Sequence, residues 1–269
     1  MRDGSPPHSS TPYPRAYIVR NRYTVPVPLW ERVEESNGPS RVALSPRRIA
    51  LAGIQIADAN GLDAVSMRQV ASRLSAGTMS LYRHVASRDE LVELMVDQVY
   101  STFSVAPRTG DWRRDLAEAA RRIHDLTLEH PWLAGQSVAR LGLGPNLLRA
   151  LESMLALVDG YGMSADQMLD VLGSLQAFVQ GHALQEITEQ NAIRATKETT
   201  PEAHDQREAR IRLIIGSDRY PQFTRVVTES TDEPDPSVVF ERRLRYLLDG
   251  LSSAFGFSGG GGGSATDPR

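Results

Sequence analysis

The stretch that decides the fold is VSMRQVASRLSAGTMSLYRHVASRDELVELM, residues 65–95. It predicts two short helices, SMRQVASRL and TMSLYRHV, separated by residues 75–77, a turn of the length that a helix-turn-helix requires. At 100° per residue, Leu81 and Val85 lie on one side of the second helix and Met79 lies on the other. Two apolar side chains therefore anchor this helix, and its polar face is left exposed.

The exposed side of this stretch carries a local excess of positive charge. From Ser66 to Arg88 there are four arginines and no acidic residue, although the whole chain has a formal net charge of -3. Phosphate contacts require such a local patch, and an arginine such as Arg83 matches guanine in the major groove. The second helix is therefore predicted to read DNA. The alternative is a surface helical hairpin in which Tyr82 and His84 only pack.

The same stretch resembles the DNA-binding domain of the tetracycline-repressor (TetR) family of transcriptional regulators. The motif is Leu-Tyr-x-His-Val, then Ser and a basic residue, then Glu-Leu, at residues 81–91, and the resemblance covers residues 47–100. It implies DNA contacts by Arg68, Thr78, Met79, Ser80, Tyr82, Arg83, His84 and Arg88. Two positions depart from the family pattern, because Ser75 replaces the glycine usual in the turn and Arg88 replaces the commoner lysine.

The remainder of the folded chain is predicted to be helical as well. N-cap residues, capping boxes and prolines at first helical positions recur, and no alternating strand pattern competes with them. We expect helices at 46–60, 67–74, 78–84, 88–104, 111–129, 132–140, 145–160, 165–190, 202–216 and 236–256. The middle of the polar segment 193–235 is expected to be a mobile loop.

These signals predict an all-α protein with two folded domains. A chain of 269 residues that is 41% apolar has enough material for one large or two modest cores. We expect a disordered proline-rich extension at 1–44, a three-helix helix-turn-helix DNA-binding domain at 45–91, a helical ligand-binding and dimerisation domain at 92–257, and a disordered glycine-rich tail at 258–269.

Small residues on helix 165–190 predict a dimer interface. They recur every four residues, which lets another helix approach closely, although such stripes also occur in ordinary cores. Helix 236–256 carries an apolar stripe that would join it, so that two helices from each subunit form a four-helix interface. The expected interface residues are Gly173, Ala177, Gly181, Leu184, Leu244, Leu248 and Leu251. The TetR resemblance likewise implies a homodimer.

The second domain is also expected to hold a pocket for a small-molecule effector. Ligand sites are mostly apolar with a few placed polar groups. The residues that fit this description are Trp132, Met154, Met168, Gln176, Phe178 and His182. Each of them could instead belong to the core, with His182 bonded to a backbone carbonyl. The resemblance implies that a small molecule entering this domain releases the DNA.

Several function classes lack their signatures in this chain. There is no cysteine, no phosphate-binding glycine loop before a lysine, no nucleophile elbow and no histidine-pair zinc motif. We therefore expect no enzyme activity, no cofactor and no metal. The sequence shows neither a signal peptide nor a membrane span, which favours the cytoplasm and no membrane partner.

The resulting prediction is a ligand-responsive, one-component transcriptional regulator, a repressor that binds a palindromic double-stranded DNA operator as a homodimer and is released by a small molecule. Two alternatives stay open. One is an all-helical enzyme, and the other is a protein-interaction module that acts on a small apolar ligand or an acidic partner. Salt-dependent binding to a palindromic duplex distinguishes the repressor from both.

Overall fold

The computed structural model describes residues 29–30, 44–136, 143–197, 209, 213–215, 219–230 and 235–256. Within these residues every regular element is a helix, and no strand is present. The elements are α2 (Pro46–Asn60), η1 (Leu62–Ala64), α3 (Met67–Arg73), α4 (Thr78–Tyr82), α5 (Arg88–Tyr100), α6 (Trp112–Glu129), η2 (Pro131–Gly135), α7 (Pro145–Val158), α8 (Ala165–Lys197), α10 (Pro221–Glu229) and α11 (Pro236–Phe255). The all-α prediction is confirmed.

Side-chain caps account for where several of these helices begin. Ser45, Ser66 and Ser87 each accept a hydrogen bond from the backbone N–H three residues later, at 3.3, 3.2 and 3.1 Å. Ser164 and Gln167 form a reciprocal capping box, in which the Ser164 hydroxyl accepts at 3.2 Å and the Gln167 carbonyl oxygen accepts at 2.9 Å. Caps of both kinds are among the helix-start signals that the sequence predicts.

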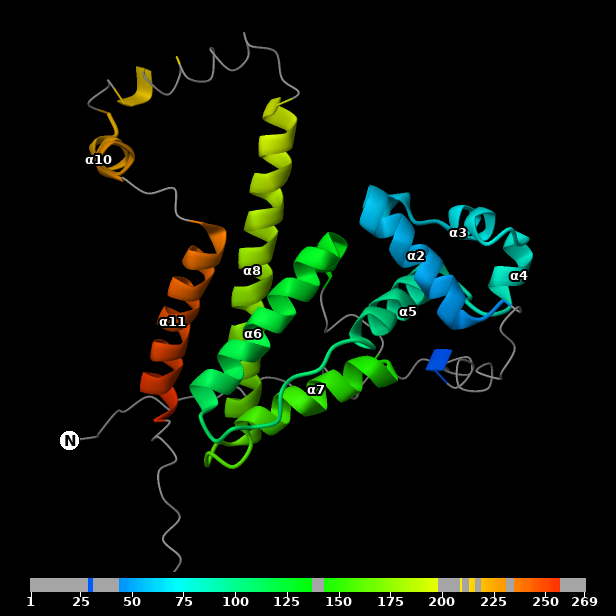
Figure 1. Cartoon of the computed structure of the whole chain (residues 1–269), viewed down its shortest axis with the longest axis horizontal. Coiled ribbons are helices and arrows are strands. Elements are labelled where there is room, and N and C mark those ends of the chain that lie inside the picture. Colours follow the sequence, from blue (N-terminus) through cyan, green and yellow to red (C-terminus); the bar gives the residue numbers. More distant parts are fainter. Residues whose placement is uncertain are drawn as a thin grey trace, which may run out of the picture.

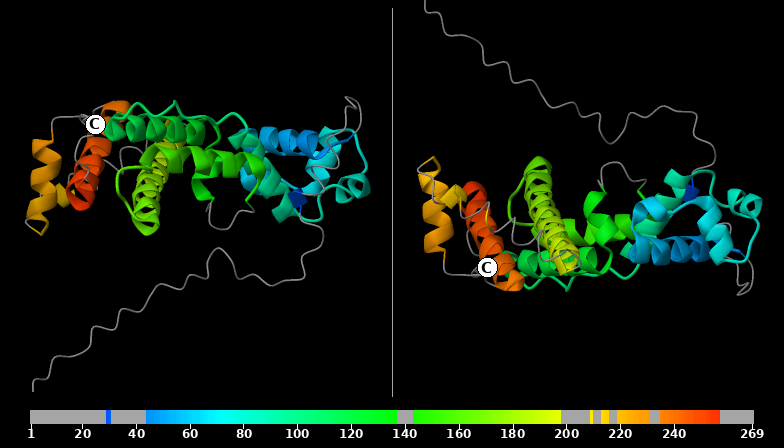
Figure 2. Two further views of the ribbon diagram at one scale, coloured as in Figure 1. Left: turned by 90° about the horizontal axis from the view of Figure 1, so that it is seen from below. Right: turned by 90° about the horizontal axis from the view of Figure 1, so that it is seen from above.

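The molecule is elongated, with the helix-turn-helix at one end (Figures 1 and 2). Helices α2, α3 and α4 lie at that end, and α10 and α11 lie at the other. Helix α5 lies between them and packs against α2 and against α7. One hydrophobic core includes residues of α2, α5, α6, α7, α8 and α11. The two ends of the protein are therefore joined by shared packing around α5.

The apolar positions of α5 explain how one helix serves both ends. Leu91, Leu94, Met95 and Val99 are all buried, as are three further residues of this helix. A helix that is buried on most of its circumference cannot turn or tilt without disturbing the packing on both sides. Its position therefore couples the DNA-binding end to the second domain.

The structure differs from the predicted elements after α7 and in the segment just before it. Helix α8 continues to Lys197, and α10 lies inside the segment 193–235, where a mobile loop was expected. Pro221 at the first position of α10 is a helix-start signal that the polar composition of this segment concealed. In place of the helix at 132–140 there is the short 3-10 helix η2, and residues 137–140 lie outside the described part.

Other predictions fall largely outside the described residues. Of the helix expected at 202–216, only residues 209 and 213–215 are described. Of the extension at 1–44, expected to be disordered, only residues 29–30 and 44 are described. The tail at 258–269 lies wholly outside the described residues. Of the helices that the structure describes, none combines the length and the hydropathy that a membrane span needs.

Candidate DNA-binding and effector sites

Two buried side chains hold α4 against the rest of the DNA-binding end. Leu81 and Val85 are completely buried. In the turn before α4, the Ala76 N–H donates to the Ala71 carbonyl at 2.9 Å. Ser75, in the same turn, has a φ of 52° and is the one non-glycine residue with positive φ in the part of the chain that is described. Because this backbone region favours glycine, Ser75 occupies a strained position, as its departure from the family pattern suggested.

The opposite face of α4 carries exposed polar and apolar groups. Met79 is 78% exposed and Tyr82 is 45% exposed, and Arg83 at the end of the helix is exposed as well. The Arg83 guanidinium donates to the Ser80 hydroxyl at 3.1 Å. Burial of His84, together with the positive charge of Arg83, lowers the pKa of this imidazole below its ordinary value. The face therefore offers one cation and several neutral hydrogen-bonding groups.

The two arginines that flank α4 differ in their surroundings. Arg68 on α3 is exposed. The Arg88 guanidinium donates through Nε to the Val65 carbonyl at 3.0 Å and through Nη2 to the Leu62 carbonyl at 2.8 Å. Arg88 therefore ties the beginning of α5 to η1 and to the residue that follows it. Its positive charge suggested a DNA contact, and the charge pattern held no sign of this structural role.

A buried carboxylate joins α5 to α7. Asp97 accepts hydrogen bonds at 2.9 Å from the backbone N–H groups of Asn146 and Leu147 and at 2.7 Å from the Asn146 side chain. The residue before α7, Gly144, has no side chain to cap the helix, so Asp97 caps it from a neighbouring element. A Cβ atom at position 144 would collide with Asp97 and with Trp30. The absence of a side chain at position 144 therefore allows Asp97 to approach the beginning of α7 closely enough to form these hydrogen bonds.

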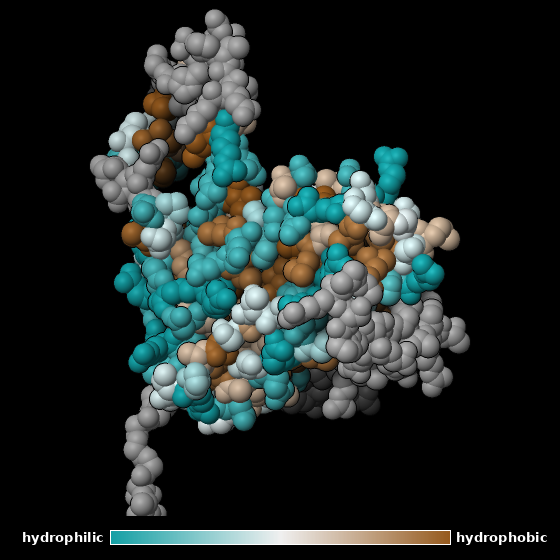
Figure 3. Space-filling view, turned by 45° about the vertical axis from the view of Figure 1, so that its right-hand side comes forward, coloured by the Kyte–Doolittle hydropathy of each residue, from teal (hydrophilic) through white to brown (hydrophobic). Residues whose placement is uncertain are grey.

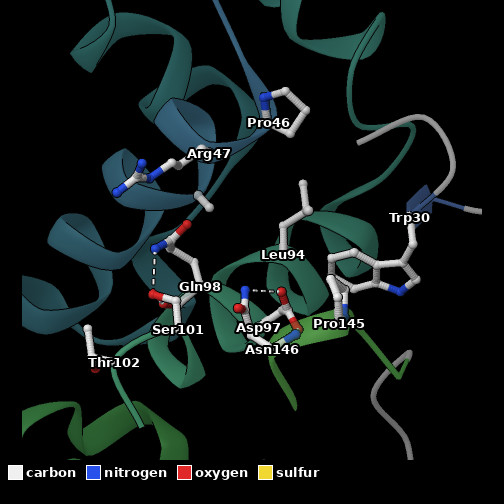
Figure 4. Close-up of a pocket in the computed structure, with 11 residues that line it drawn as sticks. Trp30, Pro46, Arg47, Leu94, Asp97, Gln98, Ser101, Thr102, Pro145 and Asn146 are labelled. Carbon is white, nitrogen blue, oxygen red and sulfur yellow. Dashed lines mark hydrogen bonds between the residues drawn. The ribbon is translucent and has the colours of Figure 1, made fainter. Parts of the chain in front are cut away.

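A cavity of about 530 Å³ adjoins this contact at the junction of α2, α5 and α7. Figure 4 shows Asp97 and Asn146 bonded to each other, with Trp30 on one side and Gln98 and Ser101 on the other. A second contact between the two ends lies at Asp58 of α2, which accepts from Trp132 Nε1 and bonds with His130 Nδ1, both at 2.8 Å. The two ends are thus held together by two carboxylates.

In the second domain, aromatic rings from three helices pack together. The ring centroids of Phe178 and His182 are 6.0 Å apart. The His124 ring stacks on Phe240 with 4.3 Å between centroids, and the rings of His182 and Phe240 meet edge-on with 5.2 Å between centroids. Burial of His182, followed by the charges of His124 and Arg243, lowers the pKa of its imidazole. Neither ring nitrogen of His182 has a hydrogen-bond partner among the described residues, so the alternative of a bond to a backbone carbonyl does not hold there.

Two of the six predicted effector residues have adjacent rings in the structure. Phe178 and His182 are in contact, and His182 lines a cleft of about 580 Å³ between α8 and α11 that none of the other five lines. Trp132 and Met154 are buried in the core, whereas Met168 and Gln176 are partly buried.

Three residues of this region were missed by the sequence reasoning. Glu186 lies four residues after His182, so helical spacing could have found it. Helix α6 supplies His124, and α11 supplies Phe240 from the middle of its apolar stripe. Nothing in the spacing along the chain links either of these two to His182.

The predicted dimer interface divides into two groups. Gly173, Ala177, Gly181 and Leu184 are exposed on α8, and a Cβ atom added at either glycine would meet no atom within 4 Å. On α11, Leu244, Leu248 and Leu251 are buried in the core of the chain itself, so their part in a dimer interface stays a prediction. Periodicity identified the apolar face of α11 correctly, but that face packs against α8 of the same chain.

Apolar residues are also exposed on α10, which stands apart from the body of the molecule. Phe223, Val226 and Val227 are exposed on it, and Figure 3 shows hydrophobic residues on the arm that rises above the main body. Exposed apolar clusters are typical of interaction surfaces.

Comparisons with known proteins agree with this architecture. The family model described as the C-terminal domain of tetracycline-repressor-like proteins matches residues 106–255. The chain is 33% identical over 225 residues to the HTH-type transcriptional repressor DrrR1 of Streptomyces coeruleorubidus, with 83% of each protein covered. It is 27% identical over 233 residues to an HTH-type transcriptional regulator of Saccharopolyspora erythraea, covering 86% of this chain and 94% of the relative.

A solved structure is similar over nearly the same length. The structure of the TetR family protein ActR of Streptomyces coelicolor, in complex with actinorhodin, superposes with a TM-score of 0.64. The two sequences are 29% identical, and the match covers 80% of this chain and 99% of the ActR chain.

Proposed function

Because the chain belongs to the tetracycline-repressor (TetR) family of transcriptional regulators, we propose that it is a ligand-responsive repressor that binds a palindromic operator as a homodimer. The observation that carries this proposal is α4, whose Leu81 is completely buried while Met79, Tyr82 and Arg83 are exposed. A short helix that is anchored on one side and polar on the other fits the major groove. The relative DrrR1 is itself named a transcriptional repressor.

We assign the DNA contacts to α3, α4 and the residues beside them. Arg83 is the residue proposed to read a base, and Met79, which is exposed on the same face, is proposed to contact base edges beside it. The remaining residues, proposed to contact phosphates or the groove walls, are Arg68, Thr78, Ser80, Tyr82, His84 and Arg88. For Arg88 the bonds to two carbonyls limit this role to its remaining N–H groups.

We place the dimer interface on the exposed face of α8. Gly173, Ala177, Gly181 and Leu184 leave this face free of bulky side chains near the two glycines, which allows close approach of a second α8. The exposed apolar residues of α10 would be covered in the same assembly.

We propose that the DNA-binding domain spans residues 45–91 and the effector and dimerisation domain spans 92–257. An effector would enter the second domain near Phe178 and His182, where aromatic rings and a cleft meet. ActR was crystallised with actinorhodin, and by similarity a small organic molecule is the proposed effector here. Binding would shift α5, which Asp97 bonds to α7, and thereby change the separation of the two recognition helices.

The proposal is tested by selecting DNA from a pool of random duplexes with the full-length protein. We expect the recovered sequences to contain an inverted repeat, because a two-fold symmetric dimer reads two equal half-sites. Binding of the selected duplex should fall steeply with salt concentration. The matched control is Arg83→Ala, which should recover no repeat under the same conditions. Recovery of unrelated sequences by the unaltered protein would contradict the proposal and favour the protein-interaction module instead.

We also propose that the protein lies in the cytoplasm, because a repressor needs access to its operator DNA.

A further inference from the structure

Three side chains outside the DNA-binding end converge in the second domain. His124 comes from α6, and His182 and Glu186 come from consecutive turns of α8. One nitrogen or oxygen atom from each of the three lies within 4.8 Å of the other two. The closest pair that is measured directly is His124 Nε2 and Glu186 Oε2, at 3.2 Å. The sequence predicted no metal, because the chain has no cysteine and no histidine-pair zinc motif.

Three of the four imidazole nitrogens in this cluster are buried and have no hydrogen-bond partner in the described part of the chain. Among the described residues, this holds for Nε2 of His124 and for both Nδ1 and Nε2 of His182. The contact of His124 with Glu186 has an ion-pair distance but not the geometry of a hydrogen bond. Buried polar groups are almost always satisfied in folded proteins, so three unmet nitrogens in one place require a partner.

We propose that His124, His182 and Glu186 bind a divalent transition-metal ion of the Zn²⁺ type. Two imidazoles and one carboxylate form a ligand set that Zn²⁺ accepts, and three protein ligands leave a position open for water or another oxygen donor. Mg²⁺ and Ca²⁺ prefer sites made of oxygen ligands and fit this set poorly. The separation of His124 Nε2 and Glu186 Oε2, 3.2 Å, is already close to that of two ligands around a tetrahedral Zn²⁺ ion.

The surroundings of the cluster suit a bound cation. The cleft of about 580 Å³ between α8 and α11 includes His182 and Glu186 in its lining and gives a route from solvent. Its titratable walls also contain Glu189 and Asp235 beside Arg242 and Arg243. The three carboxylates therefore outnumber the two arginines, and the Arg243 guanidinium is bonded to the Gln185 carbonyl oxygen at 3.1 Å.

Aromatic packing holds both imidazoles in place before a metal arrives. Phe240 stacks on His124 at 4.3 Å and meets the edge of His182 at 5.2 Å, and it is itself buried. An apolar shell of this kind limits the access of water and fixes the orientation of the ligands. The cluster therefore needs little reorganisation of its side chains to bind a metal.

The test is Zn²⁺ binding to the untagged full-length protein after treatment with a chelator, measured by competition with a chromophoric chelator. We expect one Zn²⁺ ion per protomer, and we expect Co²⁺ in its place to produce the visible absorption of a four- or five-coordinate site. His182→Gln and Glu186→Gln should each weaken binding by more than about 10-fold, since even loss of an outer partner of a metal ligand has that effect. The matched controls are His130→Gln and Glu129→Gln, which lie outside the cluster and should bind as the unaltered protein does.

Three results would overturn the proposal: no Zn²⁺ retained by the unaltered protein, equal affinity in the cluster variants, or equal loss in the controls. Circular dichroism verifies that each variant is folded. Should His182→Gln fail to fold, the near-isosteric Glu186→Gln decides the question, because its side chain keeps the same volume. The measurement uses no DNA, so its outcome is independent of the operator proposal.

Discussion

At the scale of single residues, two arginines five positions apart in the sequence perform different tasks. Arg83 makes one hydrogen bond within its own helix end, to Ser80, and remains exposed. Arg88 donates to two backbone carbonyls of the preceding segment. Both are basic residues in the same motif, and only the structure shows that Arg88 also holds the fold whereas the Arg83 side chain bonds only within its own helix end.

This difference predicts opposite effects of two alanine substitutions. Arg83→Ala should weaken binding to the selected duplex by about 1 to 3 kcal/mol, the cost of losing a guanine contact, with an unchanged free energy of unfolding. Arg88→Ala should lower the free energy of unfolding by about 1 to 2 kcal/mol, because its charge-assisted hydrogen bonds are lost. Duplex titration and urea denaturation measure the two quantities. Equal effects of both substitutions on both quantities would refute the separation of roles.

Ser75 predicts a stabilising substitution. Its φ of 52° lies in the left-handed region, where a side chain costs about 1 to 2 kcal/mol, whereas glycine loses about 0.5 to 1 kcal/mol of backbone entropy. Ser75→Gly should therefore raise the free energy of unfolding by about 0.5 to 1 kcal/mol. Ser72→Gly, on the neighbouring helix α3, is the matched control and should lower it. A loss of stability in Ser75→Gly would mean that the serine side chain contributes more than its strained backbone costs.

At the scale of secondary structure, the helices could largely be predicted, because the signals that begin and anchor a helix act between residues close in the sequence. Serine caps, prolines at first helical positions and the spacing of Leu81 and Val85 all act within a few residues, and the structure contains them as expected. Which element an apolar helix face packs against, in contrast, depends on residues far away in the sequence. Leu244 lies on the apolar face that periodicity identifies, yet nothing in the sequence states that this face packs within its own protomer.

The candidate sites divide in the same way. The residues proposed to bind DNA lie in one continuous segment, so a motif was enough to propose them. The cluster at His182 depends on His124, which lies 58 positions earlier and reaches it only through the packing of α6 on α8. No spacing rule connects two residues on separate helices.

The contact between α5 and α7 predicts a variant that loosens the junction of the two domains. Asp97→Asn replaces one acceptor with an amide N–H₂ that would face the Asn146 side chain, and it removes the negative charge beside the beginning of α7. We expect a loss of about 1 to 3 kcal/mol in the free energy of unfolding. Hydrogen exchange should rise first in the first turn of α7. Asp125→Asn on the exposed side of α6 is the control, and an equal loss there would remove the special role of Asp97.

At the scale of the whole molecule, the exposed face of α8 requires a partner in the proposed assembly. Gly181→Phe adds a large side chain where no atom of the protomer lies within 4 Å, so the protomer should fold normally. The same side chain should push away a second α8 and shift the protein toward monomers, with loss of most operator affinity. Light scattering and duplex titration measure both effects. Asp125→Phe is the control, and a dimer that survives in Gly181→Phe would place the interface elsewhere.

The central claim is that two recognition helices in one dimer read two half-sites whose separation the protein sets. It is tested most directly by inserting about 5 base pairs, half a helical turn, between the half-sites of the selected duplex. The account predicts that the lengthened duplex loses most of its affinity, because the second half-site rotates to the far side of the DNA. The salt dependence should fall as well, since fewer phosphates are contacted. Equal affinity for the two duplexes would contradict the account, because each protomer would then bind its half-site independently.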